Sequence, residues 1–137
     1  MPAFTNYLED QVLKHIFRTG SFTKPAAIYI GLMTAVTDGE AGTVTEVSGG
    51  SYARVANAPD DANWNASSGG NGTTANAAAI TFPTATADWG TATHFGIWDA
   101  ATAGNLLIYA SLTASRNITN GATPSFAAGT LTVQIDN

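Results

Sequence analysis

The chain has 137 residues, and a chain of this length is expected to form a single domain, residues 1–137, with its own core. It contains no cysteine, which excludes disulfide scaffolds, cysteine-based zinc sites and thiol nucleophiles. Only 11% of the residues are charged and the net charge is −5, so the clustered positive charge that nucleic-acid binding requires is missing.

The low charge also indicates how the surface is used. In an ordinary domain about a quarter of the residues are charged, whereas Ala, Thr, Gly, Ser and Asn take their place here. A free monomer usually keeps more charge for solubility. The composition therefore predicts a component of an assembly, with a surface that is partly covered by neighbours.

Residues 6–19 are predicted to form an amphipathic helix. Asn6, followed by Glu9 three positions later, fits a capping box, and Gly20 is a plausible C-terminal stop. Cations in the last turns suit the helix dipole. The apolar face consists of Leu8, Val12, Leu13, Ile16 and Phe17.

The rest of the chain, residues 26–136, is predicted to form strands. They are expected at 26–35, 51–58, 77–82, 94–100, 105–112 and 130–136. The alternation within them predicts that Ile28, Ile30, Ile108, Val133 and Ile135 are buried. Strands at this spacing, without intervening helices, predict an antiparallel, jelly-roll-like β-sandwich or barrel.

Residues 94–112 are predicted to form a hairpin. Strands 94–100 and 105–112 are joined by a short turn that contains Gly104. In the second strand, one face is expected to hold Leu106, Ile108, Ala110 and Leu112.

The segment 59–77 is the least ordered part of the chain by composition. It combines Asn, Ser and Gly with one large aromatic, Trp64. Such a segment cannot bury enough apolar surface to offset its own ordering cost. We therefore expect a neighbouring subunit to order it, with Trp64 as the anchor.

The residues with side chains suited to catalysis form no recognisable motif. His94 has many Ser and Thr residues around it but no G-x-S-x-G sequence, and we interpret it as a strand-end histidine bonded to backbone. Asp88 and Asp99 match a glycosidase pair by number alone. We expect no catalytic residue and no cofactor.

No metal site is expected either. His15 and His94 lie in different elements, without the spacing of known ligand motifs, so we expect no ion that both of them hold. The Asp60–Asp61 pair with Asn63 could contact a divalent cation, but adjacent acids in a loop more often lie in turns.

Several aromatic residues could form a sugar-binding platform. They are Tyr52, Trp64, Trp89, Phe95, Trp98 and Tyr109. At least half of them are expected to belong to the core or to an interface instead.

The order of several segments resembles a family of small tailed-bacteriophage virion proteins that are often labelled phage tail fiber protein. These segments are NYLEDQVLKHIF, AAIYIGLMT, TEVSGGSYARV, ITFPTATADWGTATHFGIWDAATAGNLLIYASL and AAGTLTV, and they cover most of the chain. The resemblance implies a non-enzymatic structural protein located in the virion, and it implies no catalytic residues.

Within the virion, the sequence favours a capsid cement or decoration protein on the outer surface of the head. The chain lacks the repetitive shaft of a long fibre, and its acidic, low-charge composition suits a module that lies against neighbouring subunits. The alternative is a short tail fibre or tail-associated module that contacts host-surface glycans.

The expected partners follow from this interpretation. They are further copies of the chain, with a trimer as the expected form, and the major capsid protein or other virion proteins. The interface anchors are expected to be Tyr52, Arg54, Trp64 and Trp98. No nucleic-acid partner is expected, because clustered positive charge is missing. No membrane partner is expected, because the sequence has neither a bilayer-spanning stretch nor a signal-peptide pattern at its N-terminus.

Overall fold

The computed structural model describes residues 2–67 and 70–135. In these residues, the largest sheet has six strands and is antiparallel throughout. Its strands are β1 (Ala3–Phe4), β8 (Leu106–Ile118), β7 (Gly90–Trp98), β2 (Ile28–Asp38) and β3 (Thr43–Glu46) in spatial order, while β4 (Val55–Asn57) also pairs with β2. The predicted antiparallel hairpin over residues 94–112 is confirmed as β7 and β8.

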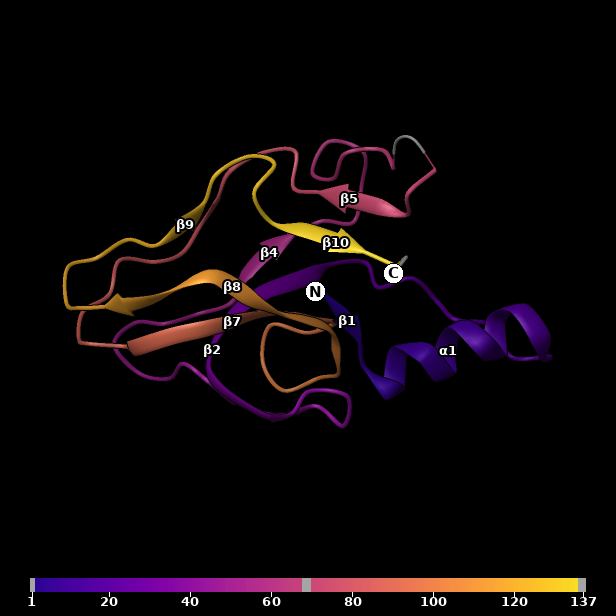
Figure 1. The fold of residues 1–137 in the computed structure, drawn as a ribbon, viewed down its shortest axis with the longest axis horizontal. Coiled ribbons are helices and arrows are strands. Elements are labelled where there is room, and N and C mark those ends of the chain that lie inside the picture. The colour runs from indigo at the N-terminus through magenta and orange to yellow at the C-terminus, as the bar shows by residue number, and fades with distance from the viewer. Residues whose placement is uncertain (1, 68–69, 136–137) are drawn as a thin grey trace.

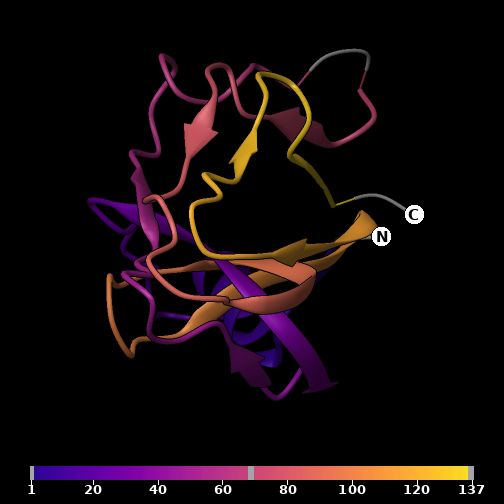
Figure 2. The ribbon, with the colours of Figure 1, turned by 90° about the vertical axis from the view of Figure 1, so that its left-hand side faces the viewer.

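Short strands form a second layer over one face of this sheet (Figure 2). They are paired as β5 (Thr73–Ala75) with β10 (Thr132–Gln134) and as β6 (Ile80–Thr81) with β9 (Ser125–Phe126). The predicted mainly β, antiparallel, sandwich-like fold with one N-terminal helix is therefore confirmed. The strands near 51–58, 77–82 and 130–136 are shorter than predicted, and Asp136 lies outside the described residues.

The main core fills the space between the two layers. Ile30 and Val133 are buried as predicted, and Ile28 and Ile108 are partly buried and pack against this core. The prediction for Ile135 is wrong, because β10 ends at Gln134 and the Ile135 side chain is 70% exposed.

A bulge in β8 changes which residues share a face. Ile97 pairs with Ile108 while Trp98 pairs with Leu106, so Leu107 is an extra residue in the ladder. As a result, Ile108 packs in the main core, whereas Leu106 packs in a second cluster with Trp98. The prediction that Leu106 and Ile108 share a face is wrong because one inserted residue reverses the alternation.

Helix α1 (Asn6–Phe17) projects from the end of the β body (Figure 1). Its N-cap is Thr5 rather than the predicted Asn6: the Thr5 hydroxyl accepts a hydrogen bond from the Leu8 backbone N–H at 3.4 Å. The helix ends at Phe17, with Arg18 as its C-cap, rather than at residue 19. No helix in the described part of the chain has the length and apolarity required to cross a bilayer.

The apolar face of α1 is covered only near its base. Leu8 is buried, but Leu13, Ile16 and Phe17 are 55%, 62% and 75% exposed. The helix contacts β1 and β8, and its second half extends beyond the sheet (Figure 1). The helical periodicity therefore predicts the helix correctly, but it does not predict which apolar side chains are buried within this chain.

The segment 59–77 is organised by its own chain in the described positions 59–67 and 70–77. Strand β5 pairs with β10, and Trp64 forms an isolated bridge with Asn76. The prediction that a neighbouring subunit is needed to order this segment is wrong, because its backbone groups find partners in distant parts of the same chain. Residues 68 and 69 lie outside the described residues.

Candidate functional site

Arg54 lies at the centre of a polar cluster against the second apolar core. Its Nε and Nη2 donate to the two carboxylate oxygens of Glu46, each at 2.8 Å. Its Nη1 donates to the backbone oxygens of Ala100 and Ala103 at 2.7 and 2.8 Å. The guanidinium also lies 4.0 Å from the centre of a Trp98 ring. This arrangement combines a bidentate ion pair with a cation–π contact, which Lys could not reproduce.

Tyr52 completes the cluster. Its hydroxyl donates to Glu46 Oε1 at 2.7 Å and accepts from the Leu32 backbone N–H at 2.9 Å. Burial raises the pKa of Tyr52 well above its usual value, and the hydrogen bond to Glu46 raises it further. The phenol therefore stays protonated and acts as a fixed donor to the carboxylate.

The cluster holds the β7–β8 connection in place. Both backbone oxygens that Arg54 binds belong to residues 99–105, where Asp99 Oδ1 also accepts from the Asn105 backbone N–H at 2.7 Å. Because the Arg54 side chain is only 7% exposed and Trp98 is 4% exposed, these residues lie in the interior of the chain. Their position indicates a structural role within the subunit. A role as interface anchors for Tyr52, Arg54 and Trp98 stays a prediction.

Trp64, the fourth predicted anchor, lines an apolar cavity of about 330 Å³. The ring is partly buried and packs against the main core, and its Nε1 is buried without a hydrogen-bond partner among the described residues. The anchoring role of Trp64 also stays a prediction, but its ring is largely engaged by its own chain.

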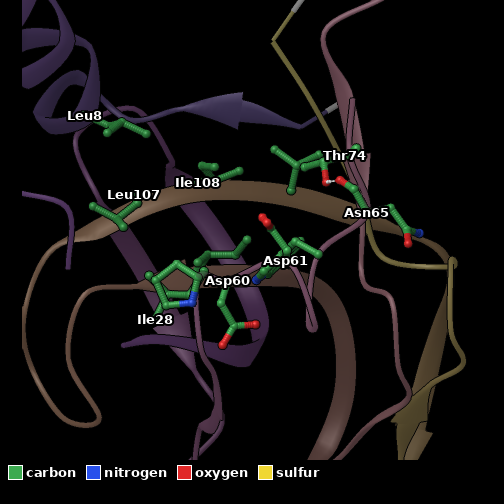
Figure 3. A pocket seen from close by; sticks show the side chains of 13 residues that line it. Leu8, Ile28, Asp60, Asp61, Asn65, Thr74, Leu107 and Ile108 are labelled. Atoms are coloured by element: carbon green, nitrogen blue, oxygen red, sulfur yellow. Dashed lines mark hydrogen bonds between the residues drawn. The ribbon is translucent and has the colours of Figure 1, made fainter. Parts of the chain in front are cut away.

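The cavity lies between the base of α1, the large sheet and residues 59–66 (Figure 3). The apolar part of its lining is formed by Leu8, Ile28, Pro59, Trp64, Ala66, Ile97, Leu107, Ile108 and Val133. The carboxylates of Asp60 and Asp61 lie beside these apolar side chains, as Figure 3 shows. The cavity is thus an apolar hollow with acidic groups at its edge.

Asp60 is used in a local turn. Its Oδ1 accepts from the backbone N–H groups of Ala62 and Asn63 and from the Asn63 side chain, at 3.1, 3.0 and 2.7 Å. This is the turn geometry expected for adjacent acids in a loop. Within residues 2–67 and 70–135, no group of three or more His, Cys, Asp and Glu side chains has an arrangement that could hold a metal ion.

His94 lies in the middle of β7 rather than at a strand end. Its Nδ1 lies 2.8 Å from the Thr93 hydroxyl, and burial lowers the pKa of the imidazole. The interpretation as a strand-end residue bonded to backbone is therefore wrong, because β7 begins at Gly90. His15 lies in α1, where its Nδ1 accepts from the Phe22 backbone N–H at 3.2 Å.

Asp88 and Asp99 do not form a catalytic pair. They flank opposite ends of β7, whose nine residues span roughly 25 Å at the usual rise of a strand. Glycosidase carboxylates lie about 5–10 Å apart. Each acid instead supports a turn, with Asp88 Oδ1 accepting from the Asn120 backbone N–H at 2.8 Å.

The expected aromatic platform is mostly internal. Trp89, Phe95 and Trp98 are each about 5% exposed or less, and Tyr52 is stacked on Phe82 and meets Trp89 edge to face. The prediction that at least half of the six aromatic residues belong to the core or to an interface is confirmed.

The sequence analysis missed Asn76, which is fully buried. Its Nδ2 donates to the Ala78 and Ala127 backbone oxygens at 2.8 and 2.9 Å, and its Oδ1 accepts from the Leu131 N–H at 2.9 Å. This one side chain joins the segment before β6 to the segment before β10. Lying among Thr and Ala, Asn76 has no local sequence signal that distinguishes it.

The chain is thus a small antiparallel β module with a projecting helix and internal polar clusters. In the comparison with protein families, residues 3–134 match the model described as Podophage GP4 fiber I protein gp80. The chain therefore belongs to this family of bacteriophage virion structural proteins, as the sequence resemblance implied. No curated protein matches the chain significantly.

Proposed function

We propose that this chain is a non-enzymatic fibre subunit located on the tail of a bacteriophage. The observation that carries the proposal is the match of residues 3–134 to a family described as a fibre protein. The capsid-cement function, which the sequence favours, becomes the second candidate.

The geometry is consistent with a structural subunit. The ionisable groups considered for catalysis lie apart from one another, with His94 in a strand and Asp88 and Asp99 in separate turns. The strongest polar cluster, around Arg54, fixes a loop and offers little surface to a substrate. The hydrogen bonds of this cluster make the loop rigid, which suits a structural role better than catalytic turnover.

The shape supports attachment at one end. Helix α1 projects from the β body along the long axis of the molecule (Figure 1). The second half of the helix presents apolar side chains to the outside. A subunit with one such projecting apolar element suits contact with a neighbouring subunit of an assembly.

A capsid cement function remains the second proposal. It is supported by the low charge of the chain and by a fold that consists of one β module without a repetitive shaft. In this case the partner would be the major capsid protein, and the subunit would stabilise the head by adding interface area.

Immunogold labelling of intact virions distinguishes these two functions. Antibodies against the purified chain are expected to label the tail, and virions that lack the chain are expected to be unlabelled. Gold distributed over the head would contradict the fibre proposal and favour cement. Heating the two kinds of virion gives a second measure: DNA release is expected at the same temperature for a fibre, and at a lower temperature without the chain for a cement protein.

A further inference from the structure

The second half of α1 forms an exposed apolar surface that we call the helix tip, defined by Leu13, Ile16 and Phe17. These residues are three and four positions apart and so lie on neighbouring positions of one helix face. More than half of each side chain is exposed. An exposed apolar group of this kind usually marks an interaction site.

Positive charge accompanies the helix tip. Lys14 lies within it, paired with Asp10 at 2.7 Å, and the exposed Arg18 follows it directly as the C-cap. The chain as a whole has a net charge of −5 and contains five Lys and Arg residues. Two of those five residues therefore lie at the helix tip.

The cavity beside Trp64 has complementary properties. Its interior is apolar, and Asp60 and Asp61 are both exposed at its edge (Figure 3). Lys24 is close by, where its Nζ donates to the Pro59 backbone oxygen at 3.0 Å. The volume of about 330 Å³ is at the lower end of the range for ligand pockets, about 300–1,000 Å³, which suits one or two side chains.

The helix tip of a subunit cannot fill the cavity of the same subunit. Leu8 lines the cavity, and Phe17 lies nine residues further along the same helix. At the rise of an α-helix, this separation is about 13 Å along the axis. A second copy is therefore needed to bring a helix tip to the cavity.

We propose that the helix tip of one copy inserts into the Trp64 cavity of a second copy. The apolar side chains of Ile16 and Phe17 enter the hollow, and Arg18 lies near the carboxylates of Asp60 and Asp61. The contact joins different surfaces of the two copies. Two copies that exchange tips reciprocally form a closed dimer, whereas a contact made once between successive copies closes into a ring or continues as a filament. This inference does not depend on whether the protein is located on the tail or on the head.

The experiment measures the mass of the full chain by sedimentation over a range of concentrations. The unmodified chain is expected to form oligomers. Phe17→Ser removes the tip, and Ala66→Trp fills the mouth of the cavity at an exposed position, so each is expected to weaken association by about tenfold or more. Ile135→Ser is the matched control, because Ile135 is 70% exposed but belongs to neither surface. This variant is expected to associate normally.

A mixing experiment tests whether the contact is between tip and cavity. The Phe17→Ser protein keeps an intact cavity, and the Ala66→Trp protein keeps an intact tip. An equimolar mixture is therefore expected to form a one-to-one complex, although neither variant associates alone. Circular dichroism and thermal unfolding of each variant show that the subunits remain folded.

Three results would overturn the proposal. An unmodified chain that stays monomeric at all concentrations would show that the two surfaces do not bind each other. An Ala66→Trp protein that associates normally would indicate contact between two helices without the cavity. Variants that fail to combine on mixing would exclude a tip-to-cavity contact.

Discussion

Two glycines, Gly31 and Gly96, leave the space that the Trp98 ring occupies. Gly31 on β2 and Gly96 on β7 are paired across the sheet, and the ring lies against both of them. A Cβ at Gly31 would lie 2.7 Å from Trp98 Cζ3 and also 2.7 Å from the Tyr52 hydroxyl. The two glycines therefore provide the space in which Trp98, Tyr52 and Arg54 meet.

Replacing Gly96 tests this arrangement. In Gly96→Ala, the new Cβ would lie 2.6 Å from Trp98 Cη2 and 2.8 Å from Leu106 Cδ1. We expect the free energy of unfolding to fall by about 1–3 kcal/mol, because overpacking forces the ring and the strand apart. Urea denaturation measures this change. Gly20→Ala is the control, since its Cβ would have only an ordinary contact at 3.7 Å, and an equal loss in both variants would contradict the explanation.

The lowered pKa of His94 is expected to make the free energy of unfolding depend on pH. Burial lowers its pKa in the folded state below the unfolded value of about 6.5. The unfolded chain therefore binds the proton more readily, so the stabilisation is fully present above about pH 6.5 and decreases as the pH falls below it. We expect the free energy of unfolding to decrease between pH 7 and pH 5, and His94→Gln to reduce this slope. An unchanged slope in His94→Gln would contradict the prediction.

At the scale of the element, α1 is fixed at its first turn and free at its end. The Thr5 hydroxyl donates to the Leu106 backbone oxygen at 2.6 Å and also caps the helix through the Leu8 N–H. The Thr5 backbone N–H donates to the Leu107 oxygen at 3.0 Å. The direction in which the helix leaves the body is therefore set by a buried residue that joins it to β8.

Removing the Thr5 hydroxyl should loosen this connection. Thr5→Ala loses the cap and leaves the buried Leu106 oxygen without this donor, so we expect a loss of about 1–2 kcal/mol in the free energy of unfolding. Thr5→Ser keeps the hydroxyl and is expected to lose much less. Chemical denaturation measures both variants, and hydrogen exchange at Leu8 shows whether the first turn opens. Equal stability of the Ala and Ser variants would contradict the capping role.

At the scale of the whole molecule, the second layer is held by contacts between segments that are distant in the sequence. Strand β5 pairs with β10, and the Asn76 N–H donates to the Leu131 oxygen at 3.2 Å. The Asn76 side chain adds three hydrogen bonds to these. The layer over the main core thus depends on one buried amide as well as on apolar packing.

Asn76→Ala is expected to destabilise the whole fold. It leaves two backbone oxygens and one N–H buried without these partners, and we expect the free energy of unfolding to fall by about 3 kcal/mol or more. Thermal unfolding followed by circular dichroism is the measurement. Asn65→Ala, at an exposed position in the same segment, is the control. A loss of stability no greater than that of the control would contradict the role of Asn76.

The features that depend on local pattern can be predicted from the sequence alone. The alternation in residues 26–35 and 94–112 is strong enough to predict antiparallel strands, and the spacing of apolar residues after Asn6 predicts a helix. Local pattern is reliable here because strand and helix periods are fixed by backbone geometry. The ordered set of segments also sufficed to indicate the virion protein family.

Which surfaces face inward depends instead on contacts between elements that are distant in the sequence. The bulge at Leu107 turns Leu106 toward Trp98, and the helix extends beyond the sheet so that Phe17 is exposed. Arg54 and Trp98, whose role as interface anchors stays a prediction, have their partners within the chain in β2, β3 and the β7–β8 connection. Asn76 likewise finds its partners up to 55 residues away. These outcomes depend on long-range contacts, which composition and periodicity do not encode, because burial is a property of the assembled layers rather than of a local stretch.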